Sequence, residues 1–91
     1  MLNIEIELSK LDSGWIITED NKLRKKFEFK GFLKTMSFVN AVAWEANSQM
    51  HHPDMEVSFS FCVINLTTHD EGNSLTEKDF LLAKRIDKLV E

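Results

Sequence analysis

Three histidines are the residues of this chain whose types and spacing could do chemistry. His51 and His52 are adjacent and directly precede Pro53, and His69 follows a Thr-Thr pair further along the chain. Histidine titrates near neutral pH, so an imidazole can donate or accept a proton at little cost. A cluster of imidazoles in a cleft would place a general acid and a general base around one small molecule.

Two other interpretations stay open on spacing alone. Three imidazoles could hold zinc, although adjacent histidines usually point in different directions and zinc sites on helices favour i, i+4 pairs. The histidines could equally be structural or incidental. The sequence contains no other nucleophile with its base, no phosphate-binding loop and no nucleotide fingerprint.

The segment that leads to the first two histidines has the period of a helix. Residues 32–50 carry apolar side chains at spacings of three and four, which predicts a helix that packs by this face on a sheet. Pro53 disfavours the α conformation at the residue before it, so the helix should end before His52. The predicted apolar face consists of Phe32, Met36, Val39, Ala43, Ala46 and Met50.

The segment that leads to the third histidine has the alternation of a strand. Residues 55–68 alternate, but the phase changes near Phe61, which predicts a bulge or one long bent strand. The chain between His52 and His69 is long enough for a strand to run out and return. We therefore expect the three histidines to converge at one end of a sheet.

The first ten residues are ambiguous. Leu2, Ile4, Ile6 and Leu8 alternate with polar residues, as in a strand, whereas Ile4, Leu8 and Leu11 also fit a helical stripe. The alternation is the stronger local signal, so we predict a strand.

The remaining patterns complete an α+β architecture. Residues 15–18 and 23–29 predict a hairpin with a short polar turn. Thr76 followed by Asp79 resembles a capping box, which predicts a helix over residues 77–90. Its apolar face would be Phe80, Leu82, Ala83, Ile86, Leu89 and Val90. The order of elements is typical of an antiparallel sheet with helices on one face.

Length and charge narrow the function further. The 91 residues predict a single domain, 1–91, whose small core makes self-association a natural source of stability. A net charge of -4 argues against direct nucleic-acid binding, since phosphates need a basic face. The short basic run 22–26 is expected to be the solvated face of a strand.

Localisation follows from cysteine use and hydropathy. Cys62 is the single cysteine, so no intrachain disulfide can form, and a reducing cytoplasm is the expected compartment. Cys62 lies in an apolar run and is interpreted as a core residue rather than a nucleophile. We see no signal peptide and no apolar run of about 18 residues that would span a membrane.

The wider pattern resembles the pterin-4a-carbinolamine dehydratases over about residues 14 to 88. The residues that carry the resemblance are Gly14-Trp15, Phe27, Phe29, Phe32, Phe38-Val39, His51-His52-Pro53-Asp54, Phe59, Thr67-Thr68-His69-Asp70, Leu75-Thr76-Glu77-Lys78-Asp79-Phe80, Leu82-Ala83 and Ile86-Asp87.

The resemblance implies a four-stranded antiparallel sheet with helices on one face, and a hydro-lyase activity. Family members dehydrate 4a-hydroxytetrahydropterin to quinonoid dihydropterin and so recycle tetrahydrobiopterin, with neither a metal nor a redox cofactor. His51, His52 and His69 match the family's catalytic histidines. The substrate-contacting stretches correspond to Met50, His51, His52, Pro53, Thr67, Thr68, His69 and Asp70. Asp79 matches an acidic position of the family. The presence of an aspartate at this position is explained equally well by its role in the capping box.

The chain also departs from the family pattern. Asn47 stands where an acidic residue is usual, four positions before the first histidine, and Met50 stands where asparagine is common. An alternative is therefore a catalytically weak interaction module of the dimerisation-cofactor type. Both alternatives imply a homo-oligomer, and a metal-binding protein is the least favoured hypothesis once the resemblance is admitted.

Overall fold

A computed structural model describes residues 2–91 of the chain. Its helices are α1 (Ile4–Ser9), α2 (Phe32–Gln49) and α3 (Glu77–Lys88), and its strands are β1 (Ile16–Ile17), β2 (Leu23–Glu28), β3 (Asp54–Val57) and β4 (Phe61–Leu66). A short 3-10 helix, η1 (His69–Glu71), follows β4. The strands form one antiparallel sheet in the order β1-β2-β4-β3. The predicted fold class, a four-stranded antiparallel sheet with helices on one face, is confirmed.

The core lies between the two central strands and the helices. The register pairs Leu23 with Leu66 and Phe27 with Cys62, so the buried side chains of β2 and β4 share one face of the sheet. Phe38 and Val42 of α2 join this core, as does the apolar face of α3. Burial raises the pKa of the Cys62 thiol to about 11, in line with its interpretation as a core residue.

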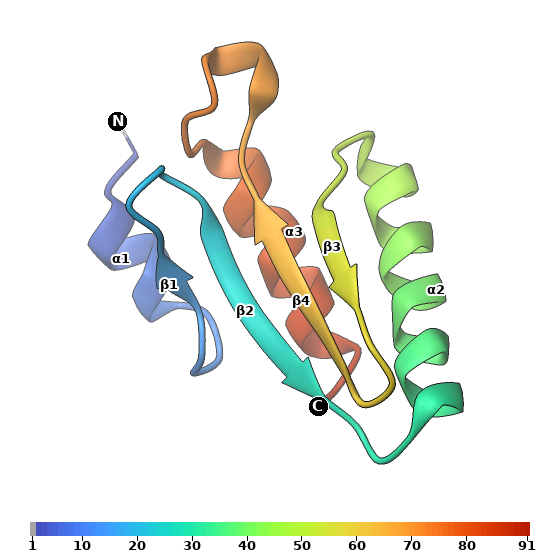
Figure 1. Ribbon diagram of the computed structural model, residues 1–91. Helices are drawn as coiled ribbons and strands as arrows, with labels where there is room; N and C mark the ends of the chain where they lie inside the picture. Colours follow the sequence, from blue (N-terminus) through green and yellow to red (C-terminus); the bar gives the residue numbers. More distant parts are fainter. Residues whose placement is uncertain (1) are drawn as a thin grey trace.

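One end of the molecule gathers the segments that carry the histidines. Figure 1 shows the last turn of α2, the loop after β4 and the first turn of α3 at the same end of the sheet. Because β4 runs toward this end and α3 runs back from it, residues on either side of the loop lie close in space.

The predicted strand over residues 1–10 is wrong. Residues Ile4–Ser9 form helix α1, whose N-terminus is capped by the Asn3 side chain, which accepts a hydrogen bond from Ile6 N–H at 3.1 Å. Ile4 and Leu8 pack against the core, whereas Ile6 is 52% exposed. The helical stripe therefore describes the burial, and the alternation does not. Met1 lies outside the described residues.

The predicted long bent strand is also wrong. β3 and β4 are two strands of a hairpin, in which Val57 pairs with Cys62 and Ser58 N–H donates to the Phe61 carbonyl at 2.9 Å. The change of phase near Phe61 marks a reversal of the chain rather than a bulge.

The buried face of α2 differs from the predicted one. Its buried residues are Thr35, Phe38, Val42 and Ala46, whereas Phe32 and Met50 are 55% and 86% exposed. Two neighbouring stripes of this helix have helical period, and the position of the sheet decides which of them is covered. The predicted helix over 77–90 ends at Lys88, and Leu89 and Val90 are exposed.

The basic run 22–26 is not uniformly solvated, which corrects the expectation for this segment. The Lys25 ammonium lies 2.8 Å from Oδ1 of the buried Asp87 in α3. The Trp15 indole N–H donates to the same carboxylate at 3.0 Å. This cluster ties the N-terminal hairpin to the last helix. Among residues 2–91, no helix is long and apolar enough to cross a membrane.

Candidate active site

The end of α2 holds the backbone of His51. Met50 has the left-handed conformation, with φ 52°, and its N–H donates to the Asn47 carbonyl at 3.1 Å. The His51 N–H donates to the Ala46 carbonyl at 3.1 Å. These two bonds form a Schellman motif, which closes the helix and fixes the direction in which the chain leaves it. His51 is thus held by the helix it follows.

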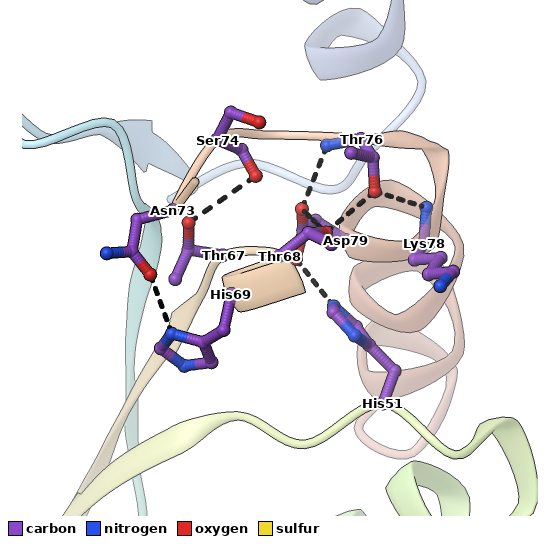
Figure 2. A network of polar contacts seen from close by, with 9 residues as sticks. All are labelled: His51, Thr67, Thr68, His69, Asn73, Ser74, Thr76, Lys78 and Asp79. Carbon is purple, nitrogen blue, oxygen red and sulfur yellow. Dashed lines mark hydrogen bonds and ion pairs between the residues drawn. The ribbon is translucent and has the colours of Figure 1, made fainter. Parts of the chain in front are cut away.

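The His51 side chain meets a buried carboxylate. Its Nε2 lies 2.6 Å from Oδ1 of Asp79, in the first turn of α3. Asp79 is fully buried and His51 is 8% exposed. Figure 2 shows the His51 ring pointing from the segment after α2 toward Asp79. A carboxylate in this position orients the imidazole and selects which nitrogen carries its proton.

The same carboxylate closes the capping box of α3. Oδ2 of Asp79 accepts from Thr76 N–H at 2.9 Å and from the Thr68 hydroxyl at 2.8 Å. The predicted capping box is therefore confirmed. Asp79 therefore caps α3 through Oδ2 and contacts His51 through Oδ1 at the same time.

His69 belongs to the segment after β4, whereas His51 belongs to the segment after α2. His69 begins η1, is exposed, and its Nδ1 lies 2.7 Å from Oδ1 of Asn73. Figure 2 shows the rings of His51 and His69 in the space between the segment after α2 and the segment after β4. His52, which directly follows His51, is exposed. The structure therefore places all three at one end of the sheet, with one buried and two accessible.

The other candidate substrate-contacting residues differ in their accessibility. Met50 and Asp70 are exposed, and Pro53 is half-buried. Thr67 and Thr68 are buried, and their hydroxyls turn to protein partners: Thr67 to the Ser74 carbonyl at 3.5 Å, and Thr68 to Asp79. The hydroxyl hydrogens of these two threonines are thus used within the protein, and a bound molecule would have to contact other atoms of Thr67 and Thr68.

Sequence reasoning missed two residues that orient the site. Asn73 contacts His69, and the hydroxyl of Thr76 contacts that of Thr68 at 2.7 Å. Thr76 is recognisable from the sequence as a helix cap, but nothing in the sequence links a cap to a histidine. Asn73 has φ 57°, a conformation that asparagine tolerates better than most residues, so its position in a tight loop was the available signal.

The arrangement favours proton transfer. Two imidazoles, each oriented by an oxygen of a side chain, stand on segments that face each other. Within residues 2–91 there is no group of three or more His, Cys, Asp or Glu side chains placed to hold a metal ion. A hollow of about 360 Å³ beside Thr68 and Thr76 is lined by neither His51 nor His69, so the histidine site is distinct from it.

Comparison with known proteins identifies relatives over nearly the whole chain. The family model described as Pterin 4 alpha carbinolamine dehydratase matches residues 2–89. A protein of Legionella pneumophila (strain Corby) is 49% identical over 84 residues, which cover 91% of this chain and 74% of the relative. A protein of Nitrosomonas eutropha is 43% identical over 83 residues, covering 91% and 72%. Both relatives bear provisional names as pterin-4-alpha-carbinolamine dehydratases.

Two solved structures have the same fold. A transcriptional coactivator/pterin dehydratase from Brucella melitensis matches with a TM-score of 0.89 at 27% identity, over 97% of this chain and 93% of that one. A pterin dehydratase-like protein identified as a RuBisCO assembly factor in the alpha-carboxysome matches with a TM-score of 0.70 at 23% identity, over 84% and 88%. At that identity the second match shows the fold alone.

Proposed function

Because the chain belongs to the pterin-4a-carbinolamine dehydratase family, we propose that it dehydrates 4a-hydroxytetrahydropterin to quinonoid dihydropterin and so recycles tetrahydrobiopterin. The observation that carries this proposal is the 2.6 Å contact that orients His51 on Asp79. An exposed second imidazole, His69, is oriented across the same space by Asn73.

The reaction needs one proton donor and one proton acceptor. The bond between C4a and the hydroxyl oxygen breaks, and a proton from an acid converts the departing hydroxide to water. A base takes a proton from a nitrogen of the pterin ring, and the electron pair left behind forms the new double bond. The step is redox-neutral, so acid and base groups suffice for its chemistry.

Three histidines can divide these roles. His51 and His69 are oriented by side-chain oxygens, and His52 stands accessible beside His51. The exposed Met50 and the half-buried Pro53 flank the pair and would offer apolar surface to a planar ring. We propose that the substrate lies between the segment after α2 and the segment after β4.

The test is the rate of 4a-hydroxytetrahydropterin dehydration measured against the spontaneous reaction. We expect the purified protein to accelerate it, and His51→Ala and His69→Ala to lower kcat by a factor of about 10² to 10⁴. Lys84→Ala, an exposed change on α3 away from the histidines, is the matched control and should retain full activity. A folded protein without acceleration over the spontaneous rate would contradict the enzymatic proposal.

A role as an interaction module has an observation of its own. Leu33 and Trp44 on the outward side of α2 are 80% and 78% exposed, and β3 is an edge strand. Large apolar side chains of this kind are typical of contact surfaces. We propose that a second copy of the chain covers this side of α2.

We also propose a cytoplasmic location. In the described residues the one cysteine is free and buried, which suits a cytoplasmic protein.

A further inference from the structure

Two threonines outside the proposed catalytic set complete the surroundings of Asp79. Thr68 follows β4, and Thr76 is the N-cap of α3. The Thr68 Oγ1 lies 2.8 Å from Asp79 Oδ2 and 2.7 Å from Thr76 Oγ1. Thr68 is 2% exposed and Asp79 is fully buried, so bulk water does not compete for these contacts.

The hydrogen bonds of this network run in one direction. An ionised carboxylate only accepts hydrogen bonds, and each hydroxyl carries a single proton. Thr68 donates that proton to Asp79, so Thr76 is the donor in the contact between the two hydroxyls. The Thr76 hydroxyl in turn accepts from Lys78 N–H at 3.3 Å. The chain of donors therefore leads from the first turn of α3 to Oδ2 of Asp79.

This direction has a consequence for His51. Oδ2 of Asp79 accepts from both Thr68 and the Thr76 backbone N–H, which leaves Oδ1 for the imidazole. Nε2 must then carry hydrogen, and in the neutral ring Nδ1 is the unprotonated atom. We propose that Thr68 and Thr76 are positioning residues that hold His51 as the Nε2–H tautomer, so that Nδ1 accepts the ring proton of the substrate. The transfer of a substrate proton to Nδ1 rests on the function proposed above.

An amide at position 79 tests the direction of the network without any substrate. In Asp79→Asn, the two donors from Thr68 and Thr76 require the amide oxygen at the Oδ2 position, which turns the NH₂ group toward His51. Nε2 must then accept, and the ring proton moves to Nδ1. One net hydrogen bond corresponds to a change of about tenfold in a population ratio. We expect ¹⁵N chemical shifts of His51 to show this inversion in the folded variant, at a pH where the ring is neutral.

The hydroxyl of Thr68 is tested by variants of matched size. Thr68→Val keeps the shape but removes one donor to Asp79, and we expect kcat to fall by about tenfold, with KM within about twofold. Thr68→Ser restores the hydroxyl and should recover kcat. Thr35→Val is the matched control: Thr35 is also buried, and its hydroxyl lies 2.9 Å from the Gly31 carbonyl and 3.1 Å from the Phe59 carbonyl instead of near Asp79. It should leave kcat and the His51 tautomer unchanged.

The outcomes separate this inference from the proposed function. His51 found as the Nδ1–H tautomer in the unmodified protein, or as Nε2–H in Asp79→Asn, would overturn the network. Equal loss of kcat in Thr68→Val and Thr68→Ser would overturn the role of the hydroxyl. A protein that fails to accelerate dehydration contradicts the proposed function, and the tautomer measurement then still decides whether the threonines position His51.

Discussion

His51, which follows the C-cap residue of α2, and Asp79, in the first turn of α3, meet through a 2.6 Å contact although they are 28 residues apart. A Schellman motif holds the backbone of the histidine, and a capping box holds the carboxylate. Two local helix-end motifs therefore place one side-chain pair, and the geometry of that pair depends on both helices being docked on the sheet.

His51 and His69 should differ in their effect on stability although both are proposed to act in catalysis. His51→Ala leaves the buried Asp79 without one partner, and we expect a loss of about 1–3 kcal/mol in the free energy of unfolding. His69→Ala changes an exposed residue and should stay within about 0.5 kcal/mol of the unmodified protein. Urea unfolding followed by tryptophan fluorescence measures both. Equal destabilisation by the two changes would contradict the burial of the His51–Asp79 pair.

The cluster around Asp87 should be strongly coupled. Its carboxylate, 2% exposed as a residue, accepts from the Lys25 ammonium at 2.8 Å and from the Trp15 indole. Lys25→Met leaves a buried charge without its cation, which we expect to cost about 3–5 kcal/mol. Asp87→Asn in the same chain should recover part of that loss, since the unpaired charge is then gone. Denaturant unfolding of the two single variants and the double variant gives the coupling, and purely additive losses would refute it.

Burial of Cys62 predicts a pH dependence of stability at alkaline pH. The ordinary pKa of a cysteine thiol is 9.0, and burial raises the pKa of Cys62 to about 11 in the folded protein. The unfolded chain therefore ionises first as pH rises, so the contribution of Cys62 to stability is complete below pH 9.0, declines as the pH rises toward about 11, and is lost above that value. Unfolding curves across this range, compared with Cys62→Ala, measure the effect. A Cys62→Ala variant with the same alkaline decline would assign the decline to other groups.

Self-association should depend on the exposed side of α2. Trp44 is 78% exposed and Leu33 is 80% exposed, and burying either on a second copy would stabilise an oligomer by about 1.5–3 kcal/mol per side chain. We expect Trp44→Glu together with Leu33→Lys to lower the mass measured by analytical ultracentrifugation. Leu81→Glu, at a half-exposed position on α3, is the control and should leave the mass unchanged. An unmodified chain that sediments as a monomer at high concentration would rule out this surface as a self-contact.

Patterns that depend on neighbours in the chain were predictable. The helix end before His52 follows from Pro53, and the start of α3 follows from Thr76 and Asp79. The hairpin of β1 and β2 and the burial of Cys62 follow from alternation and apolar context in the same way. These features are specified by turn residues, caps and side-chain period within a few positions, so one sequence is enough to find them.

Features that depend on contacts with residues distant in the sequence were not predictable. The α1 segment has the alternation of a strand as its stronger pattern and a helical stripe as its weaker one, and its Asn3 cap and the core behind Leu8 select the helix. The reversal of the chain between Val57 and Cys62 could not be recognised from the sequence, because a hairpin and a bent strand both change the phase of the apolar–polar alternation. Which stripe of α2 is buried depended on where the sheet lies.

The candidate site also combines features set by the local sequence with features set by tertiary packing. The sequence by itself determined which side chains could transfer protons, and that two of them would follow a helix and the third a strand. Only the tertiary structure decided that Asp79 reaches His51, that Asn73 reaches His69 and that the Thr68 hydroxyl is occupied within the protein. Hydrogen bonds act over about 3 Å, and such distances between residues remote in sequence are set by the packing of α2 and α3 on the sheet.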